Sequence, residues 1–167
     1  LFENCVVISD TKEFGGYGNA FWASSPEDGA HGPNGPRNVV YNCDGYSISD
    51  AVYLGGMNEN WIFAYNRLRA KQGVGFFFKT ASFDHILKGN VVILEDKNSP
   101  FILFATPDCG GVELISNTFS GGNGKLFSGL HRPLVEKDNR IIPLDTKLPR
   151  PRPQVPSIYE WQLKHKR

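Results

Sequence analysis

The sequence predicts an all-β protein folded as a parallel β-solenoid of about six coils, and two observations carry this prediction. First, asparagines recur in similar apolar surroundings along most of the chain: Asn4, Asn42, Asn66, Asn90, Asn117 and Asn139. Second, a further short apolar run follows five of them, and none of these runs keeps a helical period. Strands that recur without intervening helices are typical of a solenoid in which each repeat forms one coil.

The elements follow from these repeats. Ahead of most of the asparagines, at the third position before, stands an apolar residue: Leu1, Val39, Phe63, Leu87 or Leu114. The second runs cover residues 20–24, 52–56, 76–80, 102–106 and 125–129. They are short, contain β-branched or aromatic residues and are bounded by Gly, Pro, Ser or Asn, and these features are typical of strands. Asp44 and Glu136 interrupt the pattern, so the second and sixth repeats are imperfect.

Stacking of the repeats predicts an asparagine column. Successive coils pair in parallel about 4.8 Å apart, and parallel crossovers are right-handed, so equivalent residues lie above one another. An asparagine at a fixed turn position can adopt the left-handed conformation and bond its stacked copies. We therefore expect Asn42, Asn66, Asn90 and Asn117 in one column. The alternative is a β-sandwich in which the asparagines recur by coincidence.

The unit Val112–Phe119 resembles the repeats of the right-handed parallel β-helix, the pectin-lyase-like superfamily, and the resemblance covers residues 1–142. It implies a polysaccharide partner and an extracellular, periplasmic or cell-surface location. Lyases, glycoside hydrolases, adhesins and tail spikes all share this fold, so the resemblance leaves the activity open. The paired-aspartate and Gly-His-Gly pattern of polygalacturonase-like hydrolases is absent, and residues 30–32 match it only in part. The aspartate-rich calcium motif of pectate lyases is absent as well.

Charge and composition exclude other classes. The 18 basic and 17 acidic residues leave a net charge of +1, which argues against a nucleic-acid partner. No apolar run has the length of a membrane span, and no signal-peptide pattern is present. The three cysteines make no disulfide framework, and Cys5 and Cys43 are expected to stack as thiols. Because Leu1 enters in mid-repeat, we expect the chain to be the C-terminal part of a longer solenoid, covered by its missing N-terminal part or by another subunit.

Strand alternation assigns the facing of the second runs. If Val52, Phe76 and Ile102 point inward, an outward stripe follows from the period of two: Phe21, Tyr53, Phe77, Leu103 and Leu126. Sugar rings stack on exposed aromatic faces, so Phe21, Tyr53 and Phe77 are candidate substrate-binding residues. The alternative is that a partner segment covers the stripe. His85 falls in an apolar column and is expected in the interior.

The loops after these runs hold the candidate catalytic residues. Stacking is expected to bring acidic side chains onto one edge near Lys79 and His31: Glu27, Asp28, Glu59, Asp84 and Asp108. Such carboxylates could bind Ca²⁺ or act as the acid and base of a glycosidase, and Lys79 could abstract a proton from a uronate. The groove would run past Tyr53, Phe77 and Lys79. The alternative is that the acidic residues form turns and Lys79 is solvated.

From Pro143 the composition changes. Five prolines fall between residues 143 and 156, which a strand ladder does not accommodate, so residues 143–167 are expected to form an extended tail that caps or packs on the solenoid. Three functions remain open: a lyase or hydrolase acting on an acidic polysaccharide, a non-catalytic carbohydrate-binding or adhesive module, and a purely structural solenoid segment.

Overall fold

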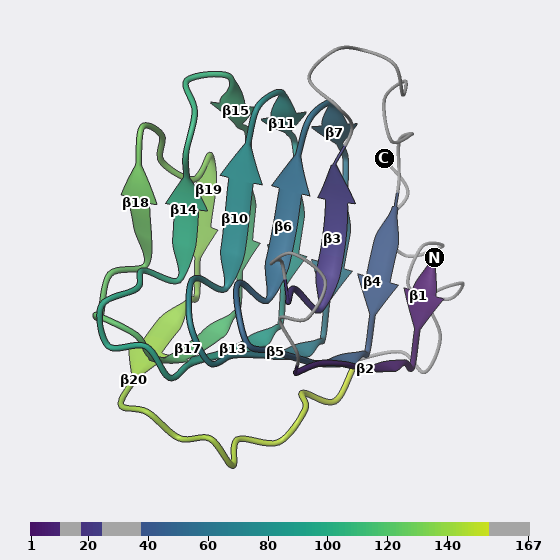
Figure 1. Cartoon of the computed structure of the whole chain (residues 1–167), viewed down its shortest axis with the longest axis vertical. Coiled ribbons are helices and arrows are strands. Elements are labelled where there is room, and N and C mark those ends of the chain that lie inside the picture. Colours follow the sequence, from purple (N-terminus) through teal and green to yellow (C-terminus); the bar gives the residue numbers. More distant parts are fainter. Residues whose placement is uncertain (11–17, 25–37, 154–167) are drawn as a thin grey trace.

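The computed structural model describes residues 1–10, 18–24 and 38–153, and these residues form a parallel β-solenoid without a helix (Figure 1). In chain order the strands are β1 (Phe2–Glu3), β2 (Val6–Ser9), β3 (Phe21–Ser24), β4 (Val39–Tyr41), β5 (Asp44–Ser47), β6 (Val52–Gly55), β7 (Asn58–Glu59), β8 (Ile62–Ala64), β9 (Arg67–Ala70), β10 (Phe76–Lys79), β11 (Ser82–Phe83), β12 (Ile86–Lys88), β13 (Val91–Leu94), β14 (Ile102–Phe104), β15 (Cys109–Gly110), β16 (Glu113–Ile115), β17 (Thr118–Gly121), β18 (Phe127–Gly129), β19 (Val135–Lys137) and β20 (Arg140–Ile142). The predicted fold class is confirmed.

The strands form four sheets, which each full coil visits in turn. Sheet A has the order β1-β4-β8-β12-β16-β19, sheet B β2-β5-β9-β13-β17-β20, sheet C β18-β14-β10-β6-β3 and sheet D β15-β11-β7. Equivalent strands of neighbouring coils pair in parallel. In Figure 1, sheet C faces the reader and runs upward, sheet A runs downward behind it, and the coils advance from right to left, so the coil is right-handed.

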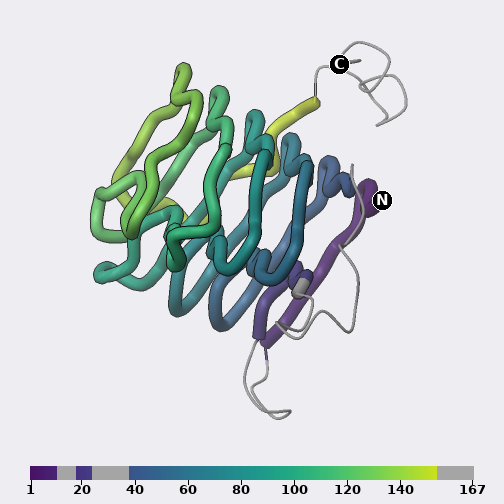
Figure 2. Tube along the Cα trace, turned by 90° about the horizontal axis from the view of Figure 1, so that it is seen from above, coloured from purple at the N-terminus to yellow at the C-terminus, as the bar shows by residue number. Residues whose placement is uncertain are grey.

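The solenoid has about four turns instead of the expected six. The two ends contribute only partial coils. Sheet D holds only three strands, and the described residues after β19 and β20 add no further strand to sheet C. Figure 2 shows the stacked coils from above, with the two ends of the stack at opposite sides.

The core is a set of inward columns along the solenoid axis. Val52, Phe76 and Ile102 stack in register in sheet C, and all three are fully buried, as the alternation predicted. Rings pack on one another along the columns; the ring centroids of Phe78 and Phe104 lie 5.6 Å apart. Parallel pairing thus repeats one cross-section in every coil and buries the same positions each time.

The asparagine ladder is present, but its register corrects the expectation for Asn42. Asn66, Asn90, Asn117 and Asn139 form the column, and each of the first three donates its Nδ2 to the Oδ1 of the next over 3.0 Å. Asn42 lies one position earlier, beside Asn4 and level with Tyr65. The left-handed conformation also belongs to this earlier position, with φ of 51° at Asn42 and 57° at Tyr65, and not to the ladder residues.

Cysteines take the ladder position in the first two coils. The backbone N–H of Cys5 donates to Sγ of Cys43 over 3.4 Å, and that of Cys43 donates to Oδ1 of Asn66 over 2.8 Å. The Cys43 thiol in turn donates to the carbonyl of Tyr41. Burial raises the pKa of the Cys43 thiol, so it stays protonated and acts as an uncharged ladder member. Both cysteines are free thiols, as expected.

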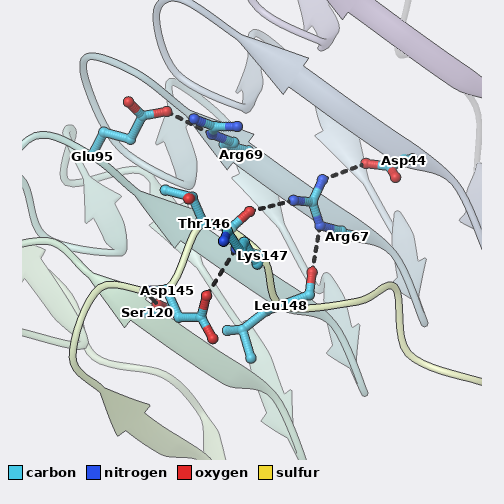
Figure 3. A network of polar contacts seen from close by, with 9 residues as sticks. All are labelled: Asp44, Arg67, Arg69, Glu95, Ser120, Asp145, Thr146, Lys147 and Leu148. Atoms are coloured by element: carbon cyan, nitrogen blue, oxygen red, sulfur yellow. Dashed lines mark hydrogen bonds and ion pairs between the residues drawn. The ribbon is translucent and has the colours of Figure 1, made fainter.

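Residues 143–153 leave the last coil and run back along the outer face of sheet B (Figures 1 and 2). We call residues 143–148 the strap. Ser120 Oγ donates to the carbonyl of Pro143 over 3.0 Å and accepts from the N–H of Asp145 over 2.7 Å. The guanidinium of Arg67 donates to the carbonyls of Thr146 and Leu148 and pairs with Asp44 over 3.1 Å (Figure 3). Ile93 points outward from β13 yet is fully buried, on the sheet face that the strap crosses.

Candidate ligand-binding face

The outer face of sheet C carries a row of side chains at the second position of each strand. Strand register places Trp22, Tyr53, Phe77, Leu103 and Ser128 in this row. We call the first three the aromatic row. The row corrects two expectations: Phe21 pairs with Val52 and is buried in the core, and Leu126 precedes β18. Trp22, and not Phe21, therefore takes the outward position on β3.

The aromatic rings differ in which surfaces they offer. Tyr53 and Phe77 have centroids 5.0 Å apart and planes within 10° of parallel, so they overlap face to face. The Tyr53 ring also leans over Gly55, where a Cβ atom would lie 2.8 Å from the ring. Trp22 meets Tyr53 at 70° and remains 60% exposed. Because Tyr53 and Phe77 cover each other, the indole of Trp22 is the large ring surface this row presents to solvent.

Lys79 lies at the end of β10, on the same outer face as Phe77. Its register partner on β6 is Gly55, the glycine that the Tyr53 ring covers, so Lys79 lies beside the aromatic row. Lys79 is half-buried. Among the described outward positions of sheet C, it is the charged residue nearest the aromatic row, and it gives that end of the face a positive charge.

The expected row of carboxylates does not form a column. Glu59 pairs with Phe83, Asp84 lies level with Gly111, and Asp108 lies level with Ala81, one position before the Ser82–Cys109 pair. Asp84 has a φ of 58° and its Oδ1 atom occupies the space above Gly111, which is the signature of a turn former. Each carboxylate therefore occupies a different step of the coil. His31, Glu27 and Asp28 lie outside the described residues.

Asp108 belongs to a small polar corner where sheet C passes into sheet D. A hydrogen bond from the Thr106 hydroxyl lowers the pKa of Asp108, which is fully exposed. Thr106 Oγ1 accepts the N–H of Thr80 over 2.7 Å, and His131 Nε2 lies 2.7 Å from the carbonyl of Pro107. A carbonyl only accepts, so Nε2 of His131 carries the proton. This corner is a hydrogen-bonded turn with an exposed carboxylate.

His85 lies in the interior, as its column predicted. Its Nδ1 accepts the backbone N–H of Trp61 over 3.2 Å, so its Nε2 carries the proton and donates to Ser82 Oγ over 2.8 Å. The ring stacks on Phe78 at 5.1 Å. Burial lowers the pKa of His85 to about 3, so the imidazole is neutral. Ser82 and His85 are both fully buried, which leaves no path for a substrate, and their pairing is structural.

Neither a metal site nor a membrane segment emerges from the described part of the chain. Residues 1–10, 18–24 and 38–153 hold no group of three His, Cys, Asp or Glu side chains placed to bind a metal ion. The same residues contain no helix long and apolar enough to cross a membrane.

Two residues in this region, Trp22 and His131, were not predicted from the sequence. Trp22 was missed because Phe21 and Trp22 are adjacent aromatics, and period two alone does not decide which points outward. His131 was missed because its partner is a backbone carbonyl; only the in-register pairing of β14 with β18 hints at its place beside Thr106.

Comparison with protein-family models, with curated proteins and with solved structures yields no match. The class shown for this chain is therefore the parallel β-solenoid fold itself.

Proposed function

We propose that the chain is a non-catalytic carbohydrate-binding module of the extracellular space or cell surface, and that it holds a polysaccharide on the outer face of sheet C. The observation that carries the proposal is the exposed indole of Trp22 at the end of the aromatic row. Sugar rings present apolar C–H faces that pack on an exposed aromatic plane, and an indole offers the largest such plane. The same row in successive strands forms a linear track along the solenoid axis.

Binding is favoured over catalysis by the placement of the ionisable groups. A glycosidase needs two carboxylates facing one bond, and a lyase needs a base beside its substrate. Glu59, Asp84 and Asp108 occupy three different steps of the coil, and His85 is buried. Lys79 supplies a positive charge near Phe77, which favours an acidic polymer over a neutral one.

Calorimetric titration with acidic and neutral polysaccharides tests the proposal. Trp22→Ala is expected to weaken binding about tenfold or more, because the stacking surface is lost. The control is Val135→Ala, which removes another exposed apolar side chain, on β19 of sheet A, and should bind as the parent does. Lys79→Gln should weaken binding of the acidic polymer only. Assays for unsaturated products and reducing ends should show no turnover.

Three results would overturn the proposal. Absence of binding to every polymer would favour a structural solenoid whose aromatic row is covered by another segment. Binding unchanged by Trp22→Ala would place the ligand elsewhere. Turnover of any polymer would restore the enzyme hypothesis.

A further inference from the structure

The last coil carries a charge at a position that is apolar in every earlier coil. Register aligns the middle residues of the sheet A strands in one inward column: Phe2, Val40, Phe63, Leu87, Leu114 and Glu136. Val40, Phe63, Leu87 and Leu114 are fully buried. Glu136 is exposed, because within residues 38–153 no further coil lies over it and the chain leaves the coil after Ile142 as the strap. The side chain that should continue the core is thus a carboxylate.

Apart from Glu136, this end of the stack has the character of an adhesive surface. Leu134 and Ile141 occupy inward positions beside the carboxylate and are 70% and 42% exposed. The strands β19 and β20 are edge strands, and edge strands readily pair with another chain. A second molecule carrying the same coil cross-section would find here both apolar surface and unpaired backbone groups.

The other end of the same 167-residue chain matches this surface at two positions. Val7 is the first residue, and Ile141 the last, of one inward column in sheet B. In an end-to-end stack, Ile141 of one copy would therefore contact Val7 of the next. The backbone N–H at each ladder position donates to the ladder side chain of the following coil. In the stack, the backbone N–H of Asn139 would therefore meet Sγ of Cys5 of the second copy. The stack would continue the core and the ladder.

Glu136 is the mismatch. In such a stack its carboxylate would be buried against Phe2 of the second copy, in a column without a basic residue. Burying an unpaired carboxylate costs more than the neighbouring apolar contacts return. An inward-pointing charge on an edge strand is a known means of preventing edge-to-edge association.

We propose that Glu136 terminates the solenoid: its inward carboxylate prevents a second copy of the chain from stacking its first coil on β19 and β20. The interaction that it suppresses is heterologous, one end against the other, so without Glu136 the contact would not close and would produce linear oligomers.

Sedimentation velocity at increasing protein concentration tests this proposal. The parent should sediment as a monomer, and Glu136→Leu should form concentration-dependent linear oligomers, associating at least tenfold more strongly. The matched control is Lys137→Leu, which adds the same side chain to the opposite face of β19 and should remain monomeric. Phe2→Glu combined with Glu136→Leu should restore the monomer, because the charge returns to the same junction from the other side.

Three outcomes would overturn the proposal: a parent that already stacks end to end, a folded Glu136→Leu variant that stays monomeric, or oligomers that persist when Phe2→Glu is added. Should Glu136→Leu fail to fold, Glu136→Gln decides. It removes the charge with little change of shape, so it should associate more strongly than the parent, and a Glu136→Gln protein as monomeric as the parent contradicts the proposal.

Discussion

Oδ1 of Asn90 accepts two hydrogen bonds from Asn66, one from its backbone N–H and one from its side-chain Nδ2, each over 3.0 Å. The same side chain of Asn90 donates to the carbonyl of Phe63 over 2.8 Å and to Oδ1 of Asn117 over 3.0 Å. Both asparagines are buried, so each ladder member satisfies polar groups of two neighbouring coils.

Asn90→Ala is expected to lower the free energy of unfolding on the order of 3 kcal/mol. The truncation leaves the buried N–H of Asn66 without its acceptor, at a cost of about 1–3 kcal/mol, and also removes the side-chain hydrogen bonds to Phe63 and Asn117. Urea denaturation followed by circular dichroism measures the change. Asn139→Ala is the control, because this partly buried residue ends the ladder and should cost about 1 kcal/mol. Equal losses at the two positions would contradict the ladder's role in stability.

Cys43→Asn should be tolerated, whereas Cys43→Ala should destabilise the protein. An asparagine at this position can accept the N–H of Cys5 as Sγ does now and can donate to the neighbouring coil as Asn66 does. Alanine leaves that N–H without its acceptor, at a cost of about 1 kcal/mol. Thermal unfolding of the two variants beside the parent measures the difference. A Cys43→Asn protein less stable than Cys43→Ala would show that the site requires the smaller thiol.

Acid is expected to destabilise the protein through His85. Its pKa is about 3 in the folded chain against 6.5 for the ordinary group, because burial disfavours the imidazolium. The unfolded chain therefore binds the proton first: the stability is full above pH 6.5 and is lost as the pH falls toward 3. The expected slope is about 1.4 kcal/mol per pH unit within this window.

His85→Gln isolates this effect. Glutamine keeps a donor and an acceptor but does not titrate, so the pH dependence of its urea midpoint should be flatter than that of the parent. Asp50 acts in the opposite sense, because burial raises its pKa and folding then favours the protonated acid. The comparison between variant and parent cancels this second group. Parallel profiles would exclude His85 as the acid-sensitive residue.

Arg67→Met should release the strap. Arg67 holds the carbonyls of Thr146 and Leu148, whereas Arg69 pairs with Glu95 over 2.6 Å and does not contact the strap (Figure 3). Trypsin cleavage after Lys147 is the readout, and we expect it to be about tenfold faster in the variant, since charged hydrogen bonds contribute about 1.5–3 kcal/mol. Arg69→Met is the matched control and should be cleaved as slowly as the parent. Equal rates in both variants would show that Arg67 does not hold the strap.

The fold was predictable because a solenoid repeats its local chemistry in the sequence. The asparagine spacing and the alternation at Val52, Phe76 and Ile102 required no knowledge of long-range contacts, and the interior place of His85 followed from its column. The slip at Asn42 has a physical cause: Val39–Tyr41 precede an asparagine as in other coils, but Cys43 supplies the ladder acceptor. The surroundings of Asn42 do not reveal that a thiol can replace an amide.

The candidate site was less predictable, because small steps of register decide which side chains meet. A shift of one residue turns a strand over and exchanges Phe21 for Trp22 on the outer face. Glu59, Asp84 and Asp108 follow turns of similar composition, yet the register places each of them at a different step of the coil.

The sequence by itself determined the parallel coils, the ladder and the inward columns, since these depend on periodicity, and periodicity is a local property of the chain. The tertiary structure alone decided the exposure of Trp22, the path of the strap over Ile93 and the position of Glu136 at the end of a core column. Each of these depends on which strand lies beside which, a long-range pairing that is fixed only when the coils close on one another.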